Sequence, residues 1–238
     1  GSFARRALRS GGLTEQVGKQ VDRGGFGGGE AIGGQSAGVG GGQRPPPAYV
    51  TADGTHVLVG SLFNDKGEDV GEAALDRLVA KPMSDKIWAR LDASSWVRDG
   101  RADAPTVVYT FSDANCPYCH HFWQAARPWV DAGKVQLRHV MVGVIREDSP
   151  AKAAAILGAP NPSAVFLQNE HDFSKGGIKP ATSISPALAN KLDANQRLMI
   201  ELGFQGTPGI LFRDAQGVVQ RVSGMPQGED MEKVMGPR

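Results

Sequence analysis

The feature that most limits the fold is an apolar run that leads into a pair of cysteines. Residues 105–111 are β-branched and aromatic almost without a break, which is typical of a buried central strand. Residues 112–115 interrupt the run, and apolar side chains then recur at helical spacing from Cys119 to Val130. A second strand is expected over residues 135–145. This order predicts a βαβ unit with the cysteines where its helix begins.

Cys116 and Cys119 are the only cysteines, and the loop between them is too small to staple a fold. The pair therefore indicates a chemical role rather than a structural one. At the first turn of the predicted helix, free backbone N–H groups and the helix dipole stabilise a thiolate on Cys116. Pro117 suits the first helical position, Tyr118 fills the second variable position, and Cys119 is expected to be buried one turn deeper. The pattern predicts a dithiol that exchanges disulfides with other molecules.

Other interpretations of the motif stay open. The pair could form a merely local disulfide, and with His120 it matches the C-x-x-C-H pattern of c-type haem attachment. Zinc bound by both cysteines and His120 or His121 is a third alternative, although no second C-x-x-C or spaced histidine pair completes four ligands. The strand-to-helix context favours disulfide exchange. The two histidines are expected to be ordinary helix residues near the rim of the site.

Thr207-Pro208 is the second anchor of the predicted site. A proline directly before an apolar strand cannot donate a hydrogen bond to the ladder, so it fits a strand entry or a cis peptide bond. In the second case the cis Thr207-Pro208 step lies against the C-x-x-C motif. Backbone polar groups there would be free to pair with an extended substrate chain.

Composition changes along the chain and predicts several regions. Residues 1–47 are Gly-rich and are expected to be partly flexible, and residues 48–79 are expected to form a small β-rich region. That region contains a hairpin of residues 48–51 and 56–60 and a turn at residues 64–67. Residues 80–100 are expected to form a linker helix, which Pro82 should interrupt. Residues 101–238 form the catalytic domain, with a helical insertion at about 149–203.

Charge and hydropathy say little about partners. Lys and Arg total 26 against 25 Asp and Glu, so no large net field attracts nucleic acid or an anionic membrane surface, and no nucleic-acid partner is expected. No stretch is apolar for long enough to span a membrane, and the start does not resemble a signal peptide. Gly1-Ser2 resembles the scar of tag removal, so the absence of a leader carries little weight.

The chain resembles the DsbC/DsbG family of bacterial periplasmic disulfide isomerases, and is closer to its DsbG branch. The resemblance runs from about residue 48 to the end, and the stretch around Trp129 is its most specific part. The motifs that carry it are residues 51–56 with 64–68, Cys116-Pro117-Tyr118-Cys119, residues 122–131, residues 142–145, and Thr207-Pro208 with residues 224–226.

The resemblance implies an α/β (α+β overall) thioredoxin fold with a helical insertion, preceded by a dimerisation region and a linker helix. It implies Cys116 as nucleophile, Cys119 as resolving thiol and Thr207-Pro208 as the cis-proline loop. No cofactor is expected beyond the redox-active disulfide of Cys116 and Cys119. Implied partners are misfolded or oxidised periplasmic proteins, a DsbD-like membrane reductant and a second copy of the chain in a V-shaped homodimer. Export to the periplasm is implied as well.

The chain departs from the family pattern at its front. Gly24 to Gly42 stands where the family builds the first half of its dimerisation domain, and it offers few apolar residues to pack. A monomer, or pairing through the remaining strands alone, is therefore the alternative to the homodimer, with simple oxidation or reduction favoured over isomerisation. Reduction of protein sulfenic acids would use the same residues. A holdase for unfolded periplasmic proteins, with secondary redox activity, is the alternative function.

Overall fold

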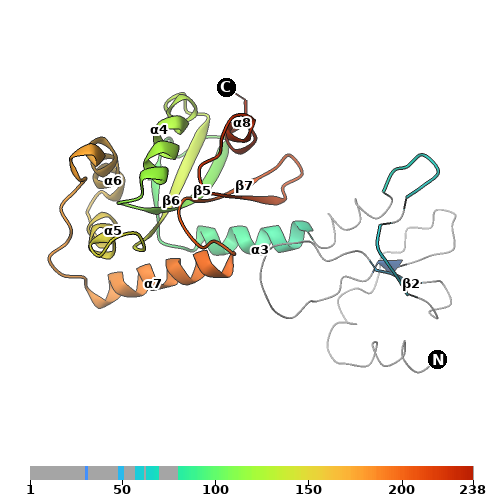
Figure 1. Cartoon of the computed structure of the whole chain (residues 1–238), viewed down its shortest axis with the longest axis horizontal. Helices are drawn as coiled ribbons and strands as arrows, with labels where there is room; N and C mark the ends of the chain where they lie inside the picture. The colour runs from blue at the N-terminus through green and yellow to red at the C-terminus, as the bar shows by residue number, and fades with distance from the viewer. Residues whose placement is uncertain (1–29, 32–47, 51–56, 62, 70–79, 238) are drawn as a thin grey trace. The chain divides into compact units, whose positions relative to one another are not determined.

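The computed structural model of the protein comprises two compact units, Gly1–Met83 and Ser84–Arg238 (Figure 1). The residues that the structure describes are 30–31, 48–50, 57–61, 63–69 and 80–237. Most of the Gly-rich segment, and much of the β-rich region of residues 48–79, therefore lie outside the described residues.

The first unit contains a small antiparallel sheet. Strands β1 (Glu30–Ala31), β2 (Ala48–Val50) and β3 (Val57–Val59) follow one another in the order β1-β2-β3. The pairing of β2 with β3 confirms the predicted hairpin, whose turn lies outside the described residues. The second predicted turn is present, because Asn64 Oδ1 accepts hydrogen bonds from the backbone N–H groups of Lys66 and Glu68, each at 2.9 Å.

The second unit is built on a five-stranded mixed sheet. In the order β4-β6-β5-β7-β8, strand β5 is central, β5 and β6 are parallel, and the remaining pairs are antiparallel. Helix α4 (Pro117–Asp131) connects β5 to β6, which confirms the predicted βαβ unit. The strands are β4 (Trp96–Asp99), β5 (Thr106–Asp113), β6 (Val135–Val142), β7 (Gly209–Arg213) and β8 (Val219–Ser223).

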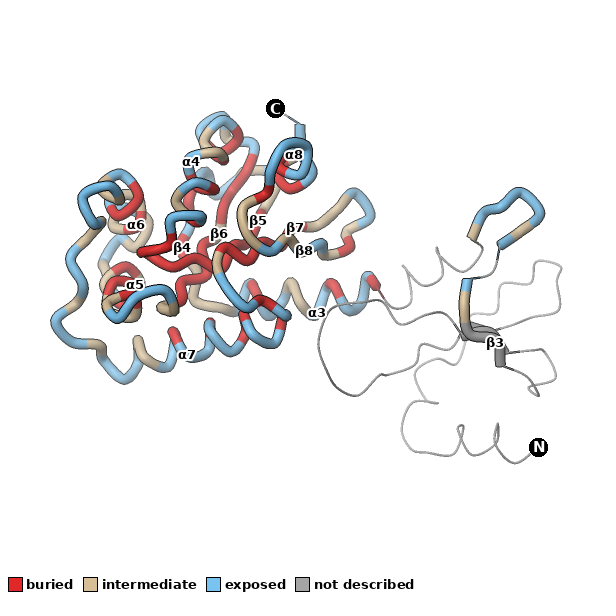
Figure 2. Tube along the Cα trace, in the orientation of Figure 1, coloured by how far each residue is buried: buried red, intermediate tan, exposed pale blue. Residues whose placement is uncertain are grey.

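Helices cover both faces of this sheet (Figures 1 and 2). Alternate residues of a strand point to opposite faces, so Val108 packs with α4 and α8 (Glu229–Met235). Its neighbour Tyr109 packs on the other face with residues of α3 (Lys81–Asp92) and α7 (Pro186–Glu201). Because both faces are covered, β5 is buried along nearly its whole length, as its apolar sequence predicts.

The predicted helical insertion lies between β6 and β7. It consists of α5 (Ser149–Leu157), α6 (Pro162–His171), the 3₁₀ turn η2 (Phe173–Lys175) and α7. A third apolar cluster joins the insertion to the sheet, with Ile156, Phe166 and Leu192 packed against Met141 and Trp123. The insertion is thereby held against α4, the helix that carries the cysteines.

The linker helix is shorter than predicted. Helix α3 ends at Asp92, and residues 96–99 form strand β4, which pairs antiparallel with β6. Helical spacing continues as far as Trp96, but Val97 and Asp99 are buried and Arg98 is exposed, which is the alternation of an edge strand. Pro82 occupies the first turn of α3, where a helix tolerates proline. From Ser84 onward the helix belongs to the second unit, where Trp88 meets Tyr109 edge-on at 5.0 Å.

Among the helices of the described ranges, none is long and apolar enough to cross a membrane.

Candidate active site

Cys116 is the N-cap residue of α4, with an extended backbone (φ −82°, ψ 114°). Its Sγ accepts a hydrogen bond from the backbone N–H of Cys119 at 3.2 Å. Pro117 stands at the start of the helix and needs no hydrogen bond there, while 62% of Tyr118 is exposed. The structure therefore places all four residues of the motif as predicted, with the sulfur of Cys116 directed at the helix N-terminus.

The two thiols differ in acidity. A hydrogen bond from the Cys119 side chain is the main cause that lowers the pKa of Cys116 to about 7. Burial opposes this shift, while the side chain of Thr207 and the Cys119 backbone N–H support it. Burial raises the pKa of Cys119 well above its ordinary value, and its position beside the Cys116 sulfur raises it further. Near neutral pH, a thiolate therefore forms more readily on Cys116, whereas Cys119 remains a thiol.

Thr207-Pro208 lies against the dithiol. The peptide bond is cis, as the second interpretation of the sequence predicts. The Cys116 thiol donates to the carbonyl oxygen of Thr207 at 3.4 Å, although the two residues are far apart in the chain. The Pro208 carbonyl accepts from the N–H of Gly224 at 2.8 Å, which ties the loop to the end of β8. Only 1% of Cys116 is exposed, so this loop covers the sulfur.

The carboxylate of Asp113 supports the turn before Cys116, and no motif of the sequence marks it. Its Oδ1 accepts from the N–H of Asn115 and the hydroxyl of Ser149, each at 2.8 Å. Its Oδ2 accepts from the N–H groups of Val144 at 2.6 Å and Ile145 at 3.0 Å. An aspartate at the end of a buried strand was the only signal in the sequence. Its more distant partners come from the loop after β6 and from the first residue of α5.

His120 is not the ordinary rim residue that the sequence suggested. Its Nδ1 lies 2.8 Å from Oε2 of Glu170, a buried carboxylate of α6. The imidazole stacks on Phe173 with ring centroids 4.3 Å apart and planes 5° apart, and on Trp123 at 5.8 Å. These contacts hold the ring against Phe173 and Trp123. His121 is exposed and meets Tyr118 edge-on at 6.3 Å.

Replacing Glu170 by glutamine should change how stability depends on pH. Burial raises the pKa of Glu170 above 4.5, so its ionisation in the folded state costs stability as pH rises through the folded pKa. Glutamine keeps a hydrogen bond to His120 without that cost. We expect Glu170→Gln to gain stability relative to the parent protein as pH rises above about 4.5, and not below it. Urea unfolding at several pH values measures this, and the exposed control Glu147→Gln should show no such trend.

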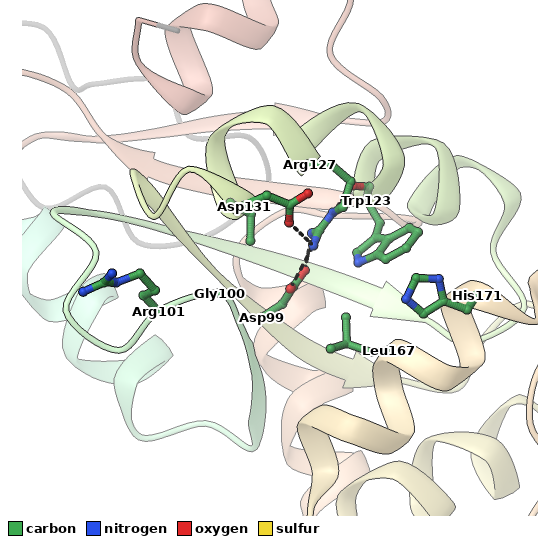
Figure 3. A pocket seen from close by; sticks show the side chains of 9 residues that line it. Asp99, Gly100, Arg101, Trp123, Arg127, Asp131, Leu167 and His171 are labelled. Carbon is green, nitrogen blue, oxygen red and sulfur yellow. Dashed lines mark hydrogen bonds and ion pairs between the residues drawn. The ribbon is translucent and has the colours of Figure 1, made fainter.

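A second buried charge network ties α4 to β4 (Figure 3). Arg127 Nη1 donates to Asp99 Oδ1 at 3.1 Å, and Nη2 donates to Oδ2. Burial opposes ionisation of Asp99, but the His139 ring, whose Nε2 lies 3.6 Å from Asp99 Oδ2, and the hydrogen bonds from Arg127 outweigh it and lower the pKa of Asp99. A groove of about 400 Å³ lies beside this network, lined also by Trp123 and by His171 of α6. The network thus connects the C-terminal half of α4 to the end of β4.

No group of three or more metal-ligating side chains is arranged to hold a metal ion within the described residues.

Alkylation of Cys116 should report its acidity directly. Because its pKa is lowered to about 7, the thiolate fraction rises with pH and reaches half near pH 7. We therefore expect the iodoacetamide rate at Cys116, followed by mass spectrometry, to have its midpoint near pH 7. In denaturant the midpoint should move up to about 8.5, the value of a free thiol. A native midpoint at the free value would contradict the proposed N-cap stabilisation.

Comparison with known proteins agrees with this geometry. The model of the thioredoxin-like domain family matches residues 99–236. The thiol:disulfide interchange protein DsbG of Pseudomonas aeruginosa is 47% identical over 190 residues, which cover 80% of this chain and 74% of that protein. DsbG of Escherichia coli K12 is 39% identical over 188 residues, covering 79% and 76%.

Solved structures show the same fold at lower identity. A periplasmic thioredoxin-like protein from Salmonella enterica serovar Typhimurium has a TM-score of 0.51 at 19% identity, covering 63% of this chain and 94% of that one. The catalytic domain of Proteus mirabilis ScsC has a TM-score of 0.50 at 21% identity, covering 64% and 96%. From the family match and the two DsbG relatives it follows that this chain belongs to the thioredoxin-like family and, within it, to the DsbG group of thiol:disulfide interchange proteins.

Proposed function

We propose that this protein is a periplasmic thiol:disulfide isomerase and reductase, with Cys116 as its nucleophile. The observation that carries the proposal is the N-cap position of Cys116, whose Sγ accepts the Cys119 N–H at 3.2 Å and whose pKa is lowered to about 7. A thiolate is the reactive form of cysteine, and this one forms near physiological pH. Cys119 stays protonated and is available to resolve the mixed disulfide.

The reaction begins when the Cys116 thiolate attacks one sulfur of a substrate disulfide. That S–S bond breaks, a mixed disulfide forms with Cys116, and the other substrate sulfur leaves as a thiolate. In isomerisation, a different substrate thiolate attacks the mixed disulfide and releases Cys116 unchanged. In reduction, Cys119 loses its proton and attacks Cys116, so the substrate leaves reduced and the protein becomes the Cys116–Cys119 disulfide.

Substrates with a sulfenic acid fit the same cycle. Attack of the Cys116 thiolate on R–SOH forms the mixed disulfide and releases hydroxide, and Cys119 then completes the reduction. Each reduction leaves the Cys116–Cys119 disulfide, which a DsbD-like membrane protein would return to the dithiol. The redox-active disulfide is the only cofactor that this cycle requires. Misoxidised periplasmic proteins are the proposed substrates, and pairing into a homodimer through the first unit is the proposed assembly.

The potential of the Cys116–Cys119 couple tests the proposal. Equilibration against glutathione buffers, followed by trapping of free thiols, gives the fraction oxidised at each ratio. We expect a potential of roughly −120 to −180 mV, because a stabilised Cys116 thiolate makes the disulfide easier to reduce. A couple below about −300 mV, resistant to glutathione, would mark the pair as a structural disulfide and contradict the proposal.

A further inference from the structure

The turn before Cys116 is hydrogen-bonded to side chains of α5 and of its N-cap residue. Asn115 is buried, and its Nδ2 donates to Oδ1 of Asp148 and to Oγ of Ser149, each at 2.9 Å. Its Oδ1 accepts from Nζ of Lys152 at 2.8 Å. The side-chain amide of Asn115 therefore forms hydrogen bonds to residues at the start of the helical insertion through both its NH₂ group and its carbonyl oxygen. A side chain bonded in this way has little freedom to rotate.

Lys152 itself is an unusual residue for its position. Only 5% of it is exposed, although it lies in a helix rich in alanine. Its ammonium donates to the Gly176 carbonyl at 2.7 Å as well as to Asn115, and Asp148 lies 3.5 Å away. A buried ammonium is costly unless it is paired and hydrogen-bonded, and these three contacts meet that condition. The ammonium therefore bridges the loop after η2 and the turn that carries Cys116.

The conformation of Asn115 determines the position of Cys116 at the N-terminus of α4. Asn115 precedes Cys116 directly, its N–H is held by Asp113, and the Cys116 N–H donates to the Asp113 carbonyl at 3.0 Å. The thiolate is stabilised only while Cys116 keeps its N-cap conformation, with Sγ within reach of the Cys119 N–H. A rotation at Asn115 would carry the sulfur away from that donor.

We propose that Lys152 and Asn115 are positioning residues for the reaction of Cys116, and that Lys152 acts through the Asn115 amide to hold the nucleophile at the N-terminus of α4. The insertion then has a second role besides covering the sheet, because its first helix sets the reactivity of the dithiol. The inference rests on the proposed function only in taking Cys116 as the nucleophile.

The test compares the pH dependence of Cys116 alkylation in Lys152→Met and the parent protein. Methionine keeps a similar length and removes the ammonium. We expect the midpoint to move up by about one pH unit, toward the value of a free thiol. At pH 6 the rate of Cys116 alkylation should fall about three-fold. The thiolate population is about tenfold smaller, but a thiolate of higher pKa is intrinsically more nucleophilic, which offsets part of the loss. The matched control is Lys191→Met, an exposed lysine of α7, which should leave the midpoint unchanged.

A double-mutant comparison separates action through Asn115 from a direct effect of charge. Asn115→Ala should raise the midpoint as well, and adding Lys152→Met to it should change nothing further. Additive shifts, or a Lys152→Met protein with lowered thermal stability and an unchanged midpoint, would overturn the proposal. If Lys152→Met does not fold, Asp148→Ala removes another partner of Asn115 at a half-buried position and should give a smaller shift in the same direction. Alkylation needs no substrate disulfide, so a protein without interchange activity would refute the proposed function and leave this comparison intact.

Discussion

A Cys119→Ser variant should accumulate a stable mixed disulfide with its substrate, whereas Cys116→Ser should form none. Serine at position 119 retains a hydroxyl that can donate to the Cys116 sulfur, the contact that contributes most to the lowered pKa of Cys116. Attack therefore continues, but the second thiol is missing and the intermediate cannot be released by reduction. Without Cys116 no thiolate stands at the helix N-terminus, and interchange activity should fall on the order of 10³-fold or more.

Non-reducing electrophoresis after incubation with a protein that carries scrambled disulfides distinguishes these outcomes. The two serine variants are matched controls for each other, because each retains one cysteine. Isomerisation does not require Cys119, so Cys119→Ser should keep part of that activity while its reductase activity is lost. A mixed disulfide that forms through Cys119 in the Cys116→Ser protein would contradict the assigned roles.

Replacing Trp129 by alanine should cost more stability than any surface change. Only 1% of Trp129 is exposed, and it packs in the cluster that joins α4 to Met231 and Val234 of α8. Its Nε1 donates to the Gly236 carbonyl at 2.9 Å, which fastens the chain after α8. Loss of a large buried aromatic side chain typically lowers the free energy of unfolding by about 3–5 kcal/mol, because a cavity remains. That is a large part of the stability of an ordinary domain.

Urea unfolding followed by far-ultraviolet circular dichroism measures this loss without relying on tryptophan fluorescence. Trp129→Phe is the matched control, because it keeps an aromatic ring and removes the hydrogen bond to Gly236, at an expected cost of about 1–2 kcal/mol. A loss below about 1 kcal/mol for the alanine variant would mean that α8 contributes little to the core.

The local parts of the fold could be predicted from the sequence. The apolar run of β5, the break after it and the helical spacing of α4 are neighbours in the chain, so one pattern predicts the strand, the turn and the site of both cysteines. Thr207-Pro208 could be recognised because proline has few places in a sheet. Strand β4 was missed because four residues carry little periodicity, and its partner β6 comes much later in the chain.

The contacts that support the site could not be predicted. His120 and Glu170 are 50 positions apart, and Asn115 and Lys152 are 37 apart. No spacing rule connects such residues, since they meet only after the insertion has folded back on α4. A lysine within an alanine-rich helix was a signal, but an exposed lysine there would look the same in the sequence.

The covering of Cys116 by Thr207 has a consequence for the order in which the molecule is assembled. The two residues are 91 positions apart, and Thr207 lies two residues before β7, the strand that pairs antiparallel with β5. During synthesis from the N-terminus, both thiols emerge long before the carbonyl that covers them. A growing chain therefore passes through a stage in which its own dithiol is unshielded. The carbonyl oxygen of Thr207 reaches the Cys116 sulfur only once β7 has paired with β5, so the covering of the nucleophile is one of the last steps of assembly.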